Sequence, residues 1–257
     1  MTTGAEAEIV LALRSAGCVF AEDEAALLVA EHWSTDELAL RVSRRVAGEP
    51  LEVILGCAEF DGLRVAIDPG VFVPRRRTEY LVRRARRIAT SGSIVIDLCC
   101  GSGALGIALA AAVPGIQLYA SDVETAAVAC ARRNLAGIGE VFEGDLFDPL
   151  PPELRGRVDV LLVNAPYVPT DEIAGMPPEA RDYEPMVTLD GGPDGLDVHR
   201  RVAAGATQWL APGGTLLIEV SRQQAPNAAA ILDRAGLSAS VKRSKKHSAT
   251  VVLGTKR

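Results

Sequence analysis

The chain has 257 residues, of which 48% are hydrophobic and 23% charged, a composition typical of a globular protein with one large domain and a small appendage. No apolar run is long enough to span a bilayer, and Glu6 and Glu8 occupy the place of a basic signal-peptide segment. The net charge of −6 disfavours a general nucleic-acid binder. Five cysteines without metal-ligand spacing favour reduced thiols. We therefore expect a cytoplasmic protein with no bound metal, no membrane partner and no stable nucleic-acid partner.

Residues 1–60 are predicted to form a small helical domain. Ile9 and Leu13 share one face of a first helix, and a second helix is expected over residues 25–33. Ser34 and Glu37 have the spacing of a capping box, which predicts the start of a third helix. Because so short a bundle buries little core alone, we expect it to pack against the residues that follow.

Residues 61–78 are predicted to form a β-hairpin linker. Residues 63–67 and 71–73 have the composition of strands, and the Asp-Pro-Gly sequence between them is typical of a turn.

From residue 79 to the C-terminus, apolar strand-like segments alternate with helical ones, which predicts an α/β domain with a doubly wound, mostly parallel sheet of seven strands. The last two strands have only a short connection, so we expect a hairpin and one antiparallel end strand. The predicted strands are 94–98, 118–121, 141–143, 158–163, 215–220, 238–242 and 249–253. The predicted helices are 79–89, 104–112, 124–134, 196–209 and 223–235.

A glycine-rich turn indicates a nucleotide-like cofactor. Gly101, Gly103 and Gly106 form a G-x-G-x-x-G pattern between a predicted strand and a predicted helix. Asp122 ends the next strand, where its carboxylate can accept both ribose hydroxyls. The pattern alone fits NAD as well as S-adenosylmethionine, or only tight strand–helix packing. Asp97, at the preceding strand end, would repel a pyrophosphate but can pair with a cationic amino-acid group, directly or through water, which favours S-adenosylmethionine.

Two further cofactor contacts are expected after the third strand of the domain. Asp145 can accept a hydrogen bond from an adenine amino group, and Leu146 can cover the ring. An ordinary Gly-Asp turn explains Asp145 equally well.

The sequence Asn164-Ala165-Pro166-Tyr167, after an apolar strand, predicts the catalytic residues. The Asn164 side chain and the backbone carbonyl of Ala165 offer two acceptors to a planar –NH2 group. Pro166 lacks an N–H and holds Ala165 extended, and the Tyr167 ring can lie against a flat amide or base. Methyl transfer needs alignment of a nitrogen lone pair with an activated methyl group and requires no triad or metal. The motifs together predict N-methylation by S-adenosylmethionine.

A run of arginines over residues 75–87 is basic within an acidic chain. A solvated helix face is the simplest interpretation. Contact with an acidic protein or a local RNA segment is the alternative.

These motifs resemble the protein-(glutamine-N5) methyltransferases of the HemK/PrmC type, from about residue 40 to the C-terminus. The segments that carry the resemblance are 45–51, 54–56, 59–60, 69–71, 74–75, 78–79, 97–98, 101–104, 144–147, 164–167, 183–185, 189–192, 194–197 and 212–214.

The resemblance implies a class I S-adenosylmethionine-dependent methyltransferase fold over residues 79–257. It implies that the N-terminal helical domain docks a protein substrate, such as a release factor or a ribosomal protein, in translation. It also implies that residues 164–167 hold the substrate glutamine. The residues that it places around the cofactor are Cys99, Cys100, Gly101, Ser102, Gly103, Asp122, Leu146 and Asn164.

Three departures from the family pattern indicate a divergent paralogue. Ala165 stands where the family usually has Pro, and Cys99-Cys100 where it has Gly-Thr. Arg76 and Arg77 replace a Pro and an acidic residue in a loop near the mouth of the family's active site. The substrate is therefore predicted as a glutamine of a release factor, a ribosomal protein or another protein.

Three alternatives stay open. An adenine-N6 nucleic-acid methyltransferase also presents Asn-x-Pro-Tyr to an –NH2 group. A natural-product N-methyltransferase, acting on a small molecule, and an S-adenosylmethionine-binding protein with impaired catalysis are the others.

Overall fold

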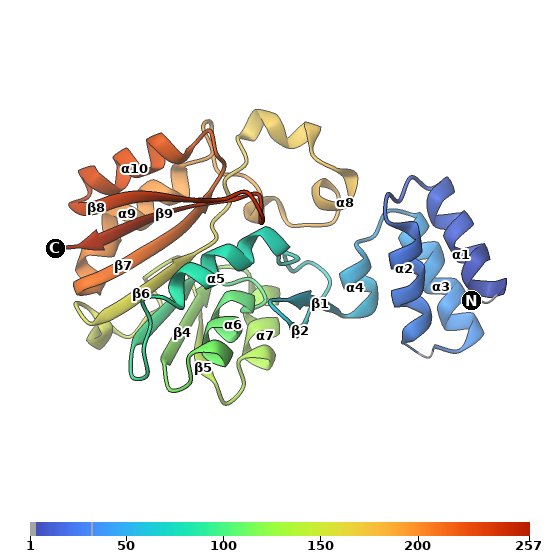
Figure 1. Ribbon diagram of the computed structural model, residues 1–257, viewed down its shortest axis with the longest axis horizontal. Helices are drawn as coiled ribbons and strands as arrows, with labels where there is room; N and C mark the ends of the chain where they lie inside the picture. The colour runs from blue at the N-terminus through green and yellow to red at the C-terminus, as the bar shows by residue number, and fades with distance from the viewer. Residues whose placement is uncertain (1–3, 32) are drawn as a thin grey trace.

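The computed structural model describes residues 4–31 and 33–257, and Figure 1 shows a small helical bundle beside a larger α/β domain. The helices of the bundle are α1 (Gly4–Ser15), α2 (Ala21–Ala30), α3 (Thr35–Val46) and α4 (Leu51–Leu55).

Local sequence signals explain where two of these helices begin. The predicted capping box of α3 is confirmed: the Ser34 hydroxyl accepts from the Glu37 N–H at 3.3 Å, and a Glu37 carboxylate oxygen accepts from the Ser34 N–H at 3.0 Å. Helix α2 begins and ends earlier than the predicted residues 25–33. Its first turn contains three acidic residues, which interact favourably with the positive end of the helix dipole.

The bundle has an apolar core of its own and polar contacts to the rest of the chain. The core residues are Ile9, Leu13, Ala21, Ala25, Leu28, Leu51 and Ile54. Arg45 of α3 pairs with Glu179 of α8 (Pro178–Arg181) at 3.0 Å. The Tyr183 hydroxyl donates to the Ala47 carbonyl at 3.0 Å. The bundle is thus attached to the segment around residue 180, which the sequence pattern did not identify as its neighbour.

The β-hairpin lies earlier in the chain than predicted. β1 (Cys57–Phe60) pairs antiparallel with β2 (Leu63–Ala66), and residues 71–73 form no strand. The turn residues Asp61 and Gly62 have φ angles of 53° and 79°, as a two-residue type I′ turn requires. Asp-Gly favours this turn, whose twist matches that of the strands, so it prevails over the Asp-Pro-Gly signal on which the prediction rested.

Seven strands form one sheet in the order β5-β4-β3-β6-β7-β9-β8, and neighbours from β5 to β7 are parallel, which confirms the predicted doubly wound sheet (Figure 1). The strands are β3 (Ile94–Leu98), β4 (Gln117–Asp122), β5 (Gly139–Glu143), β6 (Val158–Val163), β7 (Leu210–Val220), β8 (Leu237–Ser244) and β9 (Ala249–Lys256).

The antiparallel strand is inside the sheet, and its predicted position at the end was wrong. β9 lies between β7 and β8 and is antiparallel to both. The first six residues of β9 are buried, whereas β8 is mostly half-exposed and contains Lys242 and Arg243. The apolar strand therefore takes the covered position, and the charged strand takes the edge, where charge discourages association with other chains.

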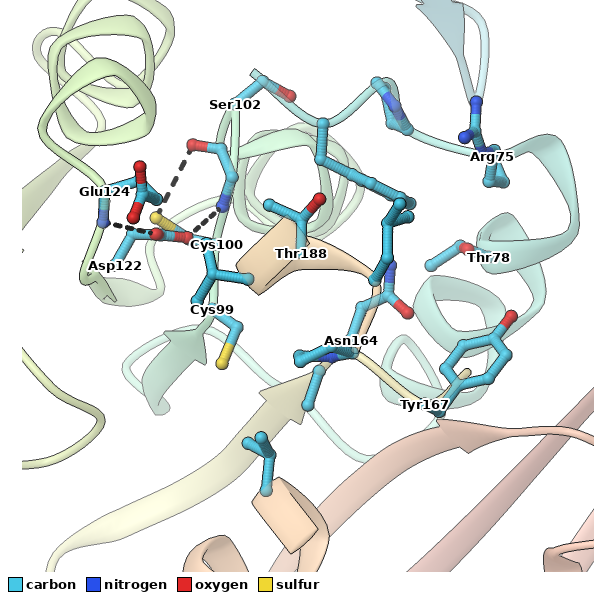
Figure 2. A pocket seen from close by; sticks show the side chains of 18 of the residues that line it. Arg75, Thr78, Cys99, Cys100, Ser102, Asp122, Glu124, Asn164, Tyr167 and Thr188 are labelled. Atoms are coloured by element: carbon cyan, nitrogen blue, oxygen red, sulfur yellow. Dashed lines mark hydrogen bonds between the residues drawn. The ribbon is translucent and has the colours of Figure 1, made fainter. Parts of the chain in front are cut away.

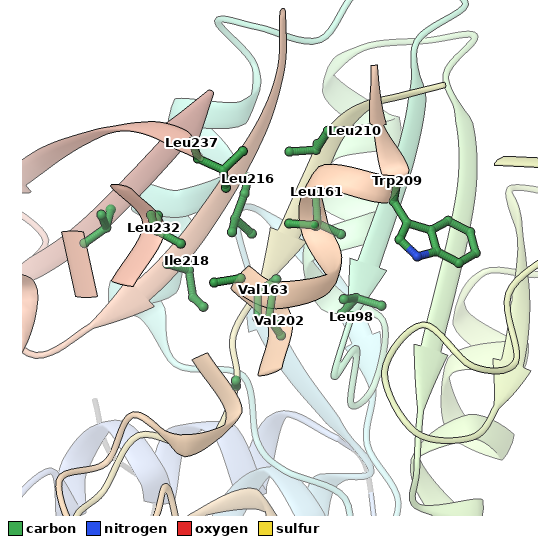
Figure 3. Close-up of a cluster of buried hydrophobic side chains, with 14 of the residues drawn as sticks. Leu98, Leu161, Val163, Val202, Trp209, Leu210, Leu216, Ile218, Leu232 and Leu237 are labelled. Atoms are coloured by element: carbon green, nitrogen blue, oxygen red, sulfur yellow. The ribbon is translucent and has the colours of Figure 1, made fainter. Parts of the chain in front are cut away.

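Helices cover both faces of the sheet. The α-helices of the domain are α5 (Glu79–Ala85), α6 (Ala104–Ala112), α7 (Thr125–Asn134), α8, α9 (Asp197–Trp209) and α10 (Ala225–Arg234). The 3-10 helices are η1 (Arg76–Thr78), η2 (Pro152–Leu154), η3 (Thr170–Gly175) and η4 (Met186–Thr188). Alternate strand residues enter two cores: Ile96 and Leu161 pack toward α9 and α10, and Val95 and Val160 pack toward α5 and α6. Figure 3 shows the first of these cores.

Because β5, β4, β3, β6 and β7 are parallel, their carboxyl ends meet at one edge of the sheet. The chain leaves β3 toward β4 on one side and crosses to β6 on the other, so the point between β3 and β6 is the topological switch point at which α/β proteins bind ligands. The glycine-rich turn, Asp122, Asp145 and Asn164 all follow strands at this edge. Within the described residues, no helix is both long and apolar enough to cross a membrane.

Candidate active site

A cavity of about 340 Å³ lies at this edge of the sheet (Figure 2). In Figure 2, Asp122 and Glu124 stand at one end of the cavity and Thr78 and Tyr167 at the other, with Asn164 between them. Eleven of the predicted site residues line it: Cys99, Cys100, Gly101, Ser102, Asp122, Asp145, Leu146, Asn164, Ala165, Pro166 and Tyr167. The two others, Asp97 and Gly103, are not among the residues that line it.

Asp122 and the glycine-rich turn are locked together at the cofactor end. The Asp122 carboxylate accepts from the Gly101 N–H at 2.8 Å and from the Glu124 N–H at 3.0 Å. Burial raises the pKa of Asp122, and the backbone hydrogen bonds oppose that rise. A Cβ added to Gly101 would meet no heavy atom within 4 Å, and the residue has a φ of 54°. The turn therefore leaves open space beside a carboxylate that has lone pairs to spare.

The Asp97 side chain binds the backbone at the start of α6 and does not line the cavity. Its side chain is fully buried, and one carboxylate oxygen accepts from the Gly106 N–H at 2.9 Å. The other oxygen has no hydrogen-bond partner among the described residues. Burial raises the pKa of Asp97 to about 8. Asp97 is not among the residues that line the cavity, so its expected pairing with a cationic amino-acid group, directly or through water, stays a prediction.

The predicted adenine contacts lie at the cavity, but Asp145 already has a partner. Its carboxylate pairs with Arg201 of α9 at 2.5 Å. Leu146 has a φ of 47°, and its carbonyl accepts from the Ser121 hydroxyl at 2.8 Å. Arg201 lies 56 residues from Asp145 in the chain, so no local pattern indicated it.

Cys99 adopts a backbone conformation that suits glycine. Its φ is 54°, in the left-handed region where a Cβ is strained by about 1–2 kcal/mol. Burial raises the pKa of the Cys99 thiol, which remains protonated at neutral pH. The family's usual Gly at this position is thus the residue that the backbone favours.

Replacing Cys99 by Gly is expected to change the free energy of unfolding by less than about 1 kcal/mol, because the added chain entropy and the lost packing of the Cys99 side chain against the core offset the relieved strain. Chemical denaturation measures the change. Cys100→Gly is the matched control: Cys100 is buried and has negative φ, so the same substitution there should destabilise the protein. Equal destabilisation by the two variants would contradict the claim that the backbone is strained at Cys99.

The acceptor end is built on the loop after β6. The Asn164 side chain reaches the cavity and has no hydrogen-bond partner among the described residues. The Ala165 methyl group is buried in the core, which leaves the backbone of this loop to face the cavity. The Tyr167 carbonyl accepts from the Gln224 side-chain amide at 2.8 Å, which ties the end of the loop to the residue before α10.

Glu219 and Arg77 fix the Tyr167 ring, and the sequence analysis assigned neither this role. The Tyr167 hydroxyl donates to Glu219 at 3.1 Å, and the Arg77 Nε donates to the same carboxylate oxygen at 3.3 Å. Burial raises the pKa of Glu219, while the Thr78 hydroxyl and Arg77 lower it. Burial, followed by the Glu219 charge, raises the pKa of Tyr167. A glutamate inside the apolar strand β7 was the available sequence signal, because a buried charge requires partners.

The arginine cluster of residues 75–87 divides between several surroundings. Arg75 binds both carboxylate oxygens of Glu184 at 2.7 Å and lines the cavity, as Arg77 does. Arg86 pairs with Asp61, and Arg83 contacts His247 at 3.1 Å on an exposed surface. The cluster is therefore not one uniform solvated face.

Comparison with known proteins connects this geometry to a family. Residues 62–175 match the family described as methyltransferase small domain. The release factor glutamine methyltransferase of Geobacter sulfurreducens is 40% identical over 198 residues, 76% of this chain and 69% of that protein. The one of Gloeobacter violaceus is 39% identical over 207 residues, 77% and 71% of the two chains. The 4-amino-L-phenylalanine/4-methylamino-L-phenylalanine methyltransferase of Streptomyces pristinaespiralis is 37% identical over 203 residues, 76% and 69%.

Solved structures agree on the fold. A methyltransferase of Pyrococcus furiosus superposes with a TM-score of 0.57 and 15% identity over 85% of this chain and 98% of its own. An rRNA methyltransferase of T. thermophilus gives 0.56 and 21% identity over 78% and 50%. The chain therefore belongs to the release factor glutamine methyltransferase family and has the class I methyltransferase fold.

Proposed function

We propose that this protein transfers a methyl group from S-adenosylmethionine to the side-chain amide nitrogen of a glutamine in a protein substrate. The observation that carries the proposal is the Asn164 side chain, which lines the cavity after β6, next to Ala165 in the chain, and has no hydrogen-bond partner in the part of the chain that the structure describes.

Two acceptors at this loop suit a primary amide. The Asn164 side-chain carbonyl and the Ala165 backbone carbonyl can each accept one N–H of an –NH2 group, and Pro166 offers no competing donor. An amide nitrogen is a poor nucleophile because its lone pair is delocalised. Acceptors on its two N–H groups increase the electron density on nitrogen and stabilise the positive charge that develops as the new bond forms.

The residues at the other end of the cavity fit S-adenosylmethionine. Asp122 has lone pairs for the ribose hydroxyls, and the space above Gly101 admits the cofactor where a side chain would block it. When bound, S-adenosylmethionine supplies a methyl group already activated by a sulfonium. The protein therefore has to align this methyl with the substrate nitrogen, and Asn164 lies between Asp122 and Tyr167 for that purpose (Figure 2).

Tyr167 orients the acceptor group. Its ring lines the cavity, and its hydroxyl is anchored by Glu219, so the ring has a fixed position against which a flat amide can lie. With the bond to carbon formed, the nitrogen loses one proton to solvent and the amide recovers its delocalisation. No group of three or more potential metal ligands gathers within residues 4–31 and 33–257, and this chemistry requires none.

The proposal is tested with purified enzyme, labelled S-adenosylmethionine and protein extracted from cells that lack this enzyme. Mass spectrometry should find one added methyl on a glutamine, with none formed by the Asn164→Ala variant. Label on lysine, on nucleic acid or on no macromolecule would contradict the proposal. The last outcome would favour the small-molecule or catalytically impaired alternatives.

One relative favours a second candidate function. The Streptomyces pristinaespiralis enzyme, at 37% identity, is named for a free amino acid whose acceptor is an aromatic amine. An arylamine presents the same planar –NH2 group as glutamine. Methylation of 4-amino-L-phenylalanine by this protein, without methylation of protein glutamine, would establish the second candidate in place of the first.

A further inference from the structure

Arg77 brings a positive charge to the acceptor end of the cavity. It belongs to η1, lines the cavity, and its guanidinium carbon lies 5.9 Å from the centre of the Tyr167 ring. Its side chain remains 48% exposed. A charged group that stands this close to Tyr167 is within reach of whatever flanks the acceptor amide.

Two other arginines of the cavity make short ion pairs with carboxylates, whereas the ion pair of Arg77 is long. Arg75 is bonded to both oxygens of Glu184 at 2.7 Å, and Arg201 is paired with Asp145 at 2.5 Å. Arg77 makes one long hydrogen bond, from its Nε to Glu219 at 3.3 Å, and its guanidinium carbon lies 5.9 Å from the centre of the Tyr167 ring. Among the described residues, no second carboxylate pairs with its guanidinium. A guanidinium has five N–H donors, so donors remain on its exposed edge.

We infer that Arg77 determines substrate specificity by binding an anionic group, a carboxylate, next to the acceptor glutamine. The inference rests on the proposed function and names its substrate class: a glutamine flanked by an acidic residue.

A competing explanation is that Arg77 only offsets the buried charge of Glu219. That carboxylate is 2% exposed and also accepts from the Tyr167 hydroxyl. To offset the Glu219 charge, Arg77 needs only its Nε contact. This explanation therefore predicts that the affinity for a substrate does not depend on the charge of the substrate. The two explanations therefore differ in a measurable quantity, the preference between acidic and neutral substrates.

The test uses three blocked peptides in which glutamine is flanked on both sides by Asp, by Asn or by Lys. Calorimetry measures their binding to the full-length protein with S-adenosylhomocysteine, which allows no turnover. The variants are Arg77→Gln and Arg77→Glu, with Arg76→Gln as the matched control. Arg76 is 81% exposed, does not line the cavity and, among the described residues, pairs only with Glu59, at 3.9 Å.

Wild type and Arg76→Gln should bind the Asp peptide about tenfold more tightly than the isosteric Asn peptide, through one charge-assisted contact. Arg77→Gln should lose this preference, and Arg77→Glu should prefer the Lys peptide. Arg77→Glu places a second carboxylate beside Glu219 and can unfold the loop. If the melting temperature of Arg77→Glu is lower than that of wild type, the test rests on the neutral Arg77→Gln variant alone. Equal binding of the Asp and Asn peptides by wild type, or an Asp preference that persists in Arg77→Gln, would overturn the inference.

Methyl transfer to the same peptides separates this inference from the proposed function. The Asp preference should appear in KM, with kcat little changed, because Arg77 binds the flanking group and not the reacting nitrogen. Glutamine methylation without a charge preference contradicts the role of Arg77 and leaves the proposed function standing. Charge-selective binding without glutamine methylation supports the anion site and contradicts the proposed function.

Discussion

Replacing Asn164 by Ala is expected to lower kcat by a factor of about 10²–10³ while the protein keeps its fold. The Asn164 side chain reaches the cavity and contacts no donor among the described residues, so its removal breaks no internal hydrogen bond. Its carbonyl instead accepts from the substrate –NH2 group as positive charge develops on nitrogen. The loss therefore falls on the transition state and appears in kcat.

Methyl transfer is measured at saturating S-adenosylmethionine, and the melting temperature is recorded in parallel. Asn227→Ala is the control, because Asn227 is an exposed asparagine on α10 outside the cavity. It should leave both quantities unchanged. Near-normal kcat in Asn164→Ala would remove this residue from the acceptor site, and the second acceptor, the Ala165 carbonyl, would then have to carry the orientation alone.

The alternation of strands and helices was predictable because each element carries its own periodic signal. Strand β6 is a continuous apolar run, as a parallel strand covered on both faces must be, and its bounds match the prediction. The position of β9 was not predictable in the same way. Hairpin geometry indicates that two strands pair, but the choice of the inner strand depends on their relative burial within the whole sheet.

The site residues that follow strands were predictable for a topological reason. Parallel strands bring the turns after them to one edge, so Asp122 and Asn164 meet at one cavity without any need for long-range information. The partners of these residues were not predictable. Tyr167 and Glu219 are 52 residues apart, and only the assembled sheet places them in contact.

Asp97 has a structural role in the fold that its position in the sequence does not indicate. A carboxylate beside a glycine-rich turn suits a cationic ligand, but in the fold it bonds to Gly106 and is fully buried. A Cβ at Gly106 would approach the Asp97 carboxylate to 3.3 Å. The third glycine of the turn is therefore explained by helix–strand packing, whereas Gly101 is explained by the open cavity.

Replacing Asp122 by Ala is expected to weaken binding of S-adenosylmethionine and S-adenosylhomocysteine by about 1–3 kcal/mol, through the loss of charge-assisted hydrogen bonds to the ribose hydroxyls. The carboxylate also accepts from the Gly101 and Glu124 N–H groups, so part of the loss arises from loosening of both loops. Calorimetry with S-adenosylhomocysteine measures the affinity, and thermal unfolding without ligand measures the loosening.

Two variants separate these contributions. Asp122→Asn keeps one carbonyl acceptor for the backbone while removing the charge, so it should retain more thermal stability than Asp122→Ala and still bind the cofactor weakly. Asp148→Ala, at an exposed position outside the cavity, should bind like wild type. If Asp122→Ala binds S-adenosylhomocysteine as tightly as wild type does, residues other than Asp122 must bind the ribose hydroxyls. Tight binding of NAD in place of S-adenosylhomocysteine would contradict the cofactor itself, because the turn at Gly101 would then be accepting a pyrophosphate beside the carboxylate of Asp122.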